Sequence, residues 1–199
     1  MPSACRRIRR SGFGVALLVA LLTPVFVAAA DGPASRSPAT VLLIRHAEKP
    51  PVGSHLSWLG VERAKRLPQL FGGPDAAPPH NLPRPAFLFA AHVGKRSNRP
   101  VETLVPLSET LQVPINSDFG DYDSKRLARL LLGGEYAGAV VLVSWRHDRL
   151  PDLARALGAK PPYTKWPDPQ FDRVWRIDYR DGVPVLTDLP QALLASDSE

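Results

Sequence analysis

The sequence has a single cysteine, Cys5, among its 199 residues. Because Cys5 lies in an N-terminal segment that we expect to be removed, the mature chain would have no thiol. A disulfide, a cysteine nucleophile and a thiolate metal site are thereby excluded for the mature protein. The sequence also lacks a His-Glu-x-x-His motif and a pair of carboxylates beside any candidate histidine. We therefore expect no metal and no other cofactor.

The sequence has little net positive charge outside the first ten residues. The chain has 25 Lys and Arg against 19 Asp and Glu, which gives a net charge of +6. Four of the arginines, Arg6, Arg7, Arg9 and Arg10, have no acid near them, so 21 cations against 19 acids leave about +2 for the rest. Binding to nucleic acid requires a basic stripe, and the remaining sequence shows none. No nucleic-acid partner is expected.

Residues 1–30 have the pattern of a bacterial export signal. The basic segment is followed by nineteen residues, 12–30, that are almost free of polar side chains and end in Val-Ala-Ala-Ala. This predicts a signal peptide cleaved after Ala30, a periplasmic or secreted protein, and no stable membrane contact after cleavage. An uncleaved inner-membrane anchor is the alternative, since nineteen apolar residues can span a bilayer. We expect a linker over 31–40, one domain over 41–190, and a flexible tail over 191–199.

Three short apolar runs predict buried strands, at 41–44, 87–91 and 139–143. Unbroken branched or aromatic runs without polar alternation are typical of parallel strands covered by helices on both faces. Helices are expected at 58–71, from about 97–99 onward, at 125–132 and at 150–157. Two closing strands are expected at 174–179 and 183–187, and a polar loop at 112–123. The pattern predicts an α/β fold.

Charged or titratable residues follow each of the three strands. Arg45 and His46 come directly after the first strand, Arg99 begins the helix after the second, and His147 follows the third. In open α/β sheets, ligands bind beyond the carboxyl ends of the strands. Arginine matches phosphate with paired donors, and a helix N-terminus also favours an anion. These positions therefore predict an anion site.

In these segments the sequence resembles the histidine phosphatase superfamily, also called phosphoglycerate mutase-like. Four segments are similar to the superfamily's motifs and occur in the same order: Leu-Ile-Arg-His-Ala-Glu at 43–48, Leu-Ser…Gly…Arg-Ala at 56–64, Arg-Pro-Val-Glu-Thr at 99–103 and Val-Leu-Val-Ser-Trp-Arg-His at 141–147. The resemblance covers most of the predicted domain. It implies a three-layer α/β/α sandwich with a mostly parallel central sheet.

The resemblance also implies a reaction. His46 would be the nucleophile that takes a phosphoryl group, Arg45 and Arg99 would bind its oxygens, and His147 would donate to the same oxygens. The protein would be an exported phosphomonoesterase that works without metal on a small-molecule or surface-linked phosphate ester. The alternatives are a non-catalytic phospho-ligand-binding protein of the same fold and a phosphomutase.

The proton donor for the leaving group is the least certain role, because the sequence departs from the superfamily here. Asn116 occupies the position where many members have a glutamate, and an amide cannot act as an acid. Another branch has an aspartate directly after the second histidine, which corresponds to Asp148. Asp148 is therefore the first candidate, and Asp118, Asp121 and Glu102 are the reserves.

Overall fold

The computed structural model describes residues 36–71, 82–92 and 97–197. The predicted signal peptide and the first half of the predicted linker lie outside these residues. Among the helices that are described, none combines the length and the apolar character needed to cross a bilayer.

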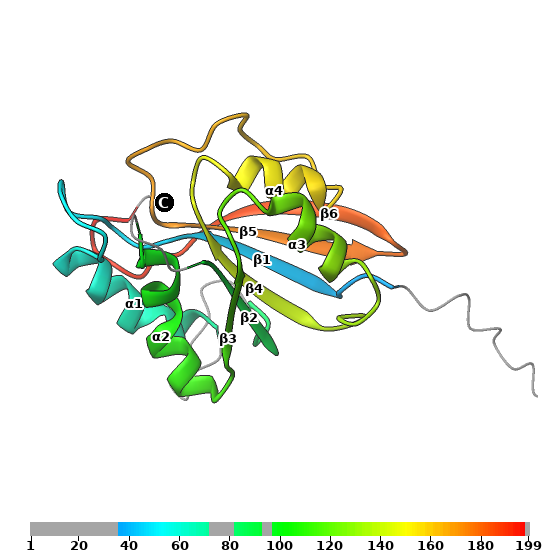
Figure 1. Cartoon of the computed structure of the whole chain (residues 1–199), viewed down its shortest axis with the longest axis horizontal. Coiled ribbons are helices and arrows are strands. Elements are labelled where there is room, and N and C mark those ends of the chain that lie inside the picture. The colour runs from blue at the N-terminus through cyan, green and yellow to red at the C-terminus, as the bar shows by residue number, and fades with distance from the viewer. Residues whose placement is uncertain (1–35, 72–81, 93–96, 198–199) are drawn as a thin grey trace, which may run out of the picture. The chain divides into compact units, whose positions relative to one another are not determined.

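The described chain forms one six-stranded sheet in the order β3-β2-β4-β1-β5-β6 (Figure 1). β1, β2, β3 and β4 run parallel to one another, whereas β5 is antiparallel to both β1 and β6. The strands are β1 (Thr40–Arg45), β2 (Phe87–Ala91), β3 (Ile115–Phe119), β4 (Val140–Trp145), β5 (Arg173–Arg180) and β6 (Val183–Pro190). The helices are α1 (Trp58–Leu70), α2 (Arg99–Leu111), α3 (Ser124–Leu131) and α4 (Leu150–Ala156). The prediction of a mostly parallel sheet is confirmed.

β1 is buried on both faces, as its unbroken apolar run predicts. Val41 and Leu43 belong to the core that includes residues of α3 and α4, whereas Leu42 and Ile44 belong to the core that includes residues of α1 and α2. Successive side chains of a strand point to opposite faces, so one run of four supplies both cores. Helices therefore cover each face, and the three-layer α/β/α arrangement is confirmed (Figure 1).

The segment expected to be a polar loop contains the edge strand β3. It pairs with β2 in parallel, and Phe119 is its one fully buried side chain. An edge strand has only one neighbouring strand, so its side chains need not be apolar on both faces. The prediction of a loop over 112–123 is wrong at β3 because the rule of continuous apolar residues holds for central strands.

Residues 191–197 are not a free tail, contrary to our expectation. The backbone N–H of Gln191 donates to the carbonyl oxygen of Asp172 at 2.6 Å, and its side-chain oxygen accepts from Arg63 Nη1 at 3.0 Å. Asp197 also bonds Arg63, at 2.6 Å and 2.9 Å. The expectation rested on the position of this segment at the end of the chain, but its polar groups pair with an arginine that is buried within the domain.

Candidate active site

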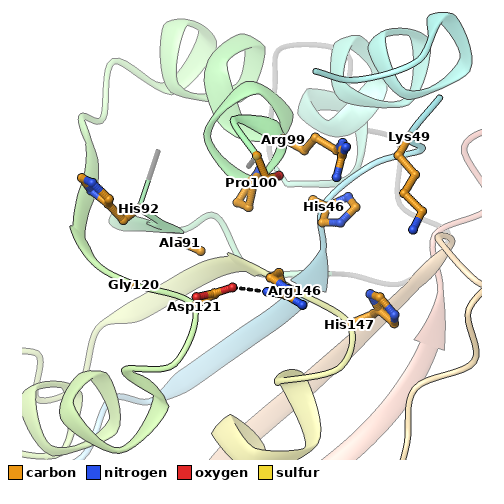
Figure 2. A pocket seen from close by; sticks show the side chains of 11 residues that line it. His46, Lys49, Ala91, His92, Arg99, Pro100, Gly120, Asp121, Arg146 and His147 are labelled. Carbon is orange, nitrogen blue, oxygen red and sulfur yellow. Dashed lines mark hydrogen bonds and ion pairs between the residues drawn. The ribbon is translucent and has the colours of Figure 1, made fainter. Parts of the chain in front are cut away.

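A pocket of about 490 Å³ lies beyond the carboxyl ends of β1, β2, β3 and β4. His46, Arg99 and His147, three of the five predicted site residues, line it together with Lys49, Asp121 and Arg146. Figure 2 shows Arg99, Lys49, Arg146 and His147 arranged around His46, while His92 lies apart at the rim. These side chains come from four different segments of the chain, which the parallel topology brings to one edge of the sheet.

His46 is 3% exposed, and its two ring nitrogens are in different surroundings. Nδ1 lies 2.7 Å from the carbonyl oxygen of Ala47, which can only accept a hydrogen bond. Nδ1 therefore carries the proton, and in the neutral ring Nε2 has a free lone pair. Burial, reinforced by the positive charges of Arg45 and Arg99, lowers the pKa of His46 from 6.5 to about 3. The imidazole is consequently neutral and nucleophilic at neutral pH.

The backbone that carries His46 is held by α1 and α2. Ala47 N–H donates to Thr103 Oγ1 at 2.9 Å, and this hydroxyl donates to the carbonyl oxygen of Arg99 at 2.7 Å. On the other side, a Cβ at Gly60 would lie 2.9 Å from Glu48 N and closer still to the Glu48 carbonyl oxygen. Only glycine permits this approach of α1. Thr103 and Gly60 thus fix the loop that carries His46.

A buried ion network also holds the loop that carries His46. Arg63 of α1 pairs with Glu48 at 2.7 Å and with Asp197 at 2.6 Å. The side chains of Arg63 and Asp197 are each 3% exposed, so the charges are almost completely removed from water. Hydrogen bonds to both carboxylates raise the pKa of Arg63 against the effect of burial. The network ties the loop of His46 to α1 and to the C-terminal segment.

Arg45, which we expected to bind the phosphoryl oxygens, is partly engaged by backbone carbonyl oxygens. Its Nη1 donates to the carbonyl oxygens of Asp168 at 2.5 Å and Gln170 at 3.0 Å, and its guanidinium lies 3.6 Å from the centre of the Phe171 ring. Burial lowers its pKa to about 10. Arg45 is not among the residues that line the pocket. Its Nε and Nη2, however, are buried without a hydrogen-bond partner in the described chain, so two of its three nitrogens still have donors for an anion.

Arg99 lines the pocket from the start of α2. Its Nε donates to the carbonyl oxygen of His55 at 3.0 Å, and its Nη2 donates to that of Gly53. Burial lowers its pKa. Nearby, Glu102 bonds the His55 ring and accepts from Leu56 N–H at 2.9 Å. Neither His55 nor Glu102 lines the pocket, so Glu102 is a structural residue here and not a proton donor.

His147 lines the pocket opposite Arg99. Its Nε2 pairs with Asp168 Oδ1 at 2.9 Å, and the Asp168 side chain is 71% exposed. Nδ1 is buried and has no partner in the part of the chain that the structure describes. Burial and the charge of Arg45 lower the pKa of His147, and the carboxylates of Asp148 and Asp168 oppose that shift. One ring nitrogen is therefore anchored, and the other is free for a ligand.

Asp148, our first candidate for the proton donor, does not line the pocket. Its carboxylate accepts from Arg146 Nη2 at 2.9 Å and lies 3.7 Å from Arg149 Nε. Asp121, one of the reserves, does line the pocket and is paired with Arg146 Nη1 (Figure 2). The sequence directs attention to the aspartate next to His147, whereas the fold brings a carboxylate from the loop after β3 into the pocket.

Sequence reasoning overlooked two cationic residues of the pocket, Lys49 and Arg146. Both were visible as neighbours of predicted residues, because Lys49 follows His46 by three positions and Arg146 precedes His147. Among the described residues, no group of three or more His, Cys, Asp or Glu side chains could hold a metal ion. The pocket combines three cations and one neutral imidazole with a free lone pair, which suits an anionic, electrophilic ligand.

No protein-family model matches the sequence, and no curated protein matches it. The fold has relatives among solved structures. A protein from Escherichia coli K-12, provisionally described as an alpha-ribazole-5'-P phosphatase, superposes with a TM-score of 0.52 at 17% identity, covering 80% of this chain and 100% of that chain.

Two further structures have TM-scores below 0.5. One, provisionally described as the phosphohistidine phosphatase SixA from Agrobacterium tumefaciens, has a TM-score of 0.46 at 17% identity and covers 76% of this chain and 98% of that one. The other, a phosphoglycerate mutase from Bacillus anthracis, has a TM-score of 0.45 at 14% identity and covers 78% of this chain and 94% of that one. The likeness to the Escherichia coli protein concerns the fold. Together with the sheet order and the three layers, it assigns this chain the phosphoglycerate mutase-like fold.

Proposed function

We propose that the chain is a metal-independent phosphomonoesterase of the histidine phosphatase superfamily that works through a phosphohistidine at His46. The observation that carries the proposal is the state of His46: it is neutral, with Nδ1 bonded to a carbonyl oxygen and Nε2 free, in a pocket lined by three cations. A neutral imidazole without a separate base is a competent nucleophile at neutral pH. The export signal predicted for residues 1–30 would place this activity outside the cytoplasm.

The reaction would proceed in two displacements at phosphorus. In the first, Nε2 of His46 forms a bond to phosphorus while the bond to the ester oxygen breaks, and that oxygen leaves as the alcohol after taking a proton. In the second, water attacks the phosphohistidine, the N–P bond breaks, and inorganic phosphate and neutral His46 result. Phosphoryl transfer is catalysed mainly by positioning and by stabilising charge on the equatorial oxygens. Arg99 and Arg45 would supply those donors, with Lys49 and Arg146 at the rim. His147 would add a donor when both of its ring nitrogens are protonated, because Nε2 already bonds Asp168.

The test is hydrolysis of p-nitrophenyl phosphate by the wild type and by His46→Ala, with chemical trapping of an acid-labile phosphoenzyme. We expect the wild type to turn over in the presence of EDTA and to form the phosphoenzyme. His46→Ala should lose at least 10³-fold in kcat, because it removes the imidazole that would take the phosphoryl group. Phosphate binding without any turnover by the wild type would instead favour the non-catalytic binding protein.

For the proton donor we propose Asp121 in place of Asp148, because its carboxyl group lines the pocket and that of Asp148 does not. A general acid matters most for a poor leaving group and typically contributes about 10²–10⁴-fold. Asp121→Asn should therefore lower kcat/KM far more for an alkyl phosphate than for p-nitrophenyl phosphate. Asp148→Asn is the matched control, since it removes the other carboxylate on Arg146. A larger selective loss in Asp148→Asn would return the role to Asp148.

A further inference from the structure

A second concave surface lies between α3 and α4, next to the active-site pocket. This groove of about 1180 Å³ is lined by the first turns of α3, by residues of α4 and by Tyr122 and Arg149 just before these helices. Its cations are Lys125, Arg126, Arg129, Arg149 and Arg155, and its acids are Asp123 and Asp152. We refer to it as the α3–α4 groove. The two helices contribute from separate segments, so the linear sequence does not display this concentration of positive charge.

The groove and the pocket together account for the net positive charge of the domain. Residues 31–199 include 21 Lys and Arg and 19 Asp and Glu. Eight of these cations and three of these acids line the two cavities, which leaves 13 cations against 16 acids elsewhere. The residues that line the cavities thus have a net charge of about +5, while the other residues of 31–199 have a net charge of about −3. Concave, cationic surfaces on an otherwise acidic protein concentrate anions at those surfaces.

The cations of the groove are only partly neutralised by protein acids. Asp152 pairs with Arg155 at 2.8 Å and with Arg149 at 3.5 Å, and Asp123 lies 3.9 Å from Arg126. Lys125 and Arg129, both exposed on α3, form no ion pair with any described residue. The groove can therefore accept additional negative charge without first breaking an internal pair at these two positions.

Tyr122 joins the groove to the active-site pocket. Its exposed ring lies 5.9 Å from the guanidinium carbon of Arg146, which lines the pocket, and 4.3 Å from that of Arg149, which lines the groove. By the sum of these distances, the two guanidinium carbons are at most about 10.2 Å apart. Asp148 holds both arginines in this position through contacts of 2.9 Å and 3.7 Å. One small molecule can thus reach both cavities.

We propose that the α3–α4 groove binds further phosphate groups of the same molecule whose transferred phosphoryl group occupies the pocket. This inference rests on the proposed phosphatase function, and it names the substrate class as small molecules with several phosphate groups. Arginine favours phosphate through paired, charge-assisted hydrogen bonds. The seven residues of α4 extend over about 10 Å, which suits several phosphates in a row better than a single one.

The experiment measures binding of inorganic tripolyphosphate and of inorganic phosphate by calorimetry. All proteins carry His46→Ala so that the ligand is not hydrolysed. The groove variant adds Lys125→Glu and Arg129→Glu, and the control variant adds Lys65→Glu and Arg180→Glu, which give the same change in net charge. Lys65 is an exposed residue of α1, and Arg180 ends β5 beside the start of β1, at the end of the sheet away from the pocket.

We expect the groove variant to bind tripolyphosphate about tenfold more weakly and to bind phosphate within twofold of its parent, because phosphate reaches only the pocket. The control variant should change both affinities by less than threefold. An equal loss in both variants, or no loss in the groove variant, would overturn the inference. Absence of tripolyphosphate binding in the parent would overturn it as well.

A parallel measurement separates this inference from the proposed function. With His46 present, the groove variant should hydrolyse p-nitrophenyl phosphate with kcat/KM within about twofold of wild type, since this ester does not extend into the groove. If the wild type failed to hydrolyse p-nitrophenyl phosphate, the proposed function would fail, yet the selective loss of tripolyphosphate affinity would still report on the groove.

Discussion

The two walls of the pocket are built in contrasting ways. The wall that carries His46 rests on buried interactions: the Thr103 hydroxyl, the close approach of Gly60, and the ion network of Arg63, whose side chain is 3% exposed. The opposite wall, from the loop after β3 and the turn after β4, is held by Arg146, whose side chain is 32% exposed. One wall is enclosed by the domain, and the other faces solvent.

The contrast separates two tasks. A nucleophile must be held in one orientation, and buried, mutually satisfied hydrogen bonds provide that rigidity. Ion pairs at a solvent-exposed wall contribute little to stability and can exchange a carboxylate for a ligand's phosphate. We infer that the His46 wall holds the proposed nucleophile and that the Arg146 wall, which also carries Asp121, recognises the remainder of the ligand. Three predictions test whether the two walls differ in this way.

The largest expected effect comes from Arg63→Met. It leaves the carboxylates of Glu48 and Asp197 buried without a counter-ion, and removing one partner of a buried pair costs about 3–5 kcal/mol. The free energy of unfolding, measured by urea titration, should fall by this amount. A change below about 1 kcal/mol would mean that the network is hydrated in solution and that the contrast between the walls is smaller than the structure indicates.

The second prediction concerns acid stability and His46. The pKa of His46 is about 3 in the folded chain, below its ordinary 6.5, so the unfolded chain binds a proton in this interval that the folded chain does not. Wild-type stability should therefore decrease as the pH falls from 6.5 toward 3, by about 1.4 kcal/mol per pH unit from this group.

His46→Gln should remove this contribution, which is checked by comparing urea unfolding at pH 6 and pH 4. His92→Gln, at an exposed histidine on the rim, provides the control. Identical pH dependence in wild type and His46→Gln would show that His46 is more hydrated than its burial implies.

The smallest effect on stability is expected for Arg146→Met, the counterpart of Arg63→Met on the opposite wall. Both substitutions remove an arginine that pairs with two carboxylates, but the partners of Arg146 are 23% and 29% exposed. Exposed pairs contribute about 0–1 kcal/mol, so the free energy of unfolding should change by no more than this. A loss comparable to that of Arg63→Met would remove the distinction between the walls.

The positions of the site residues follow from the sequence wherever strand and helix ends determine them. Apolar runs and Pro100 locate the ends of β1, β2 and β4 and the start of α2, and these ends bring His46, Arg99 and His147 to one pocket. No further information is needed to predict that these residues meet, because the carboxyl ends of parallel strands lie at the same end of the sheet.

The partners of those residues could not be predicted, because pairing over long sequence separations has no local signal. Arg63 belongs to a recognised motif, yet nothing near it indicates that Asp197 is its partner. Arg45 is correctly placed at a strand end, but its Nη1 donates to carbonyl oxygens of residues more than 120 positions away in the sequence. The residue after His147 was a reasonable candidate acid, and its actual orientation toward Arg146 depends on side-chain packing that spacing does not encode.

The pairing of Arg63 with Asp197 also has a consequence for the nascent chain. The ribosome releases Glu48 and Arg63 long before Asp197, which follows Glu48 by 149 positions. Until Asp197 emerges, Arg63 has only one of its two acidic partners. The loop that carries His46 then lacks part of the ion network that holds it in place. Catalytic competence would then be acquired late in synthesis, after β6 has been added to the sheet.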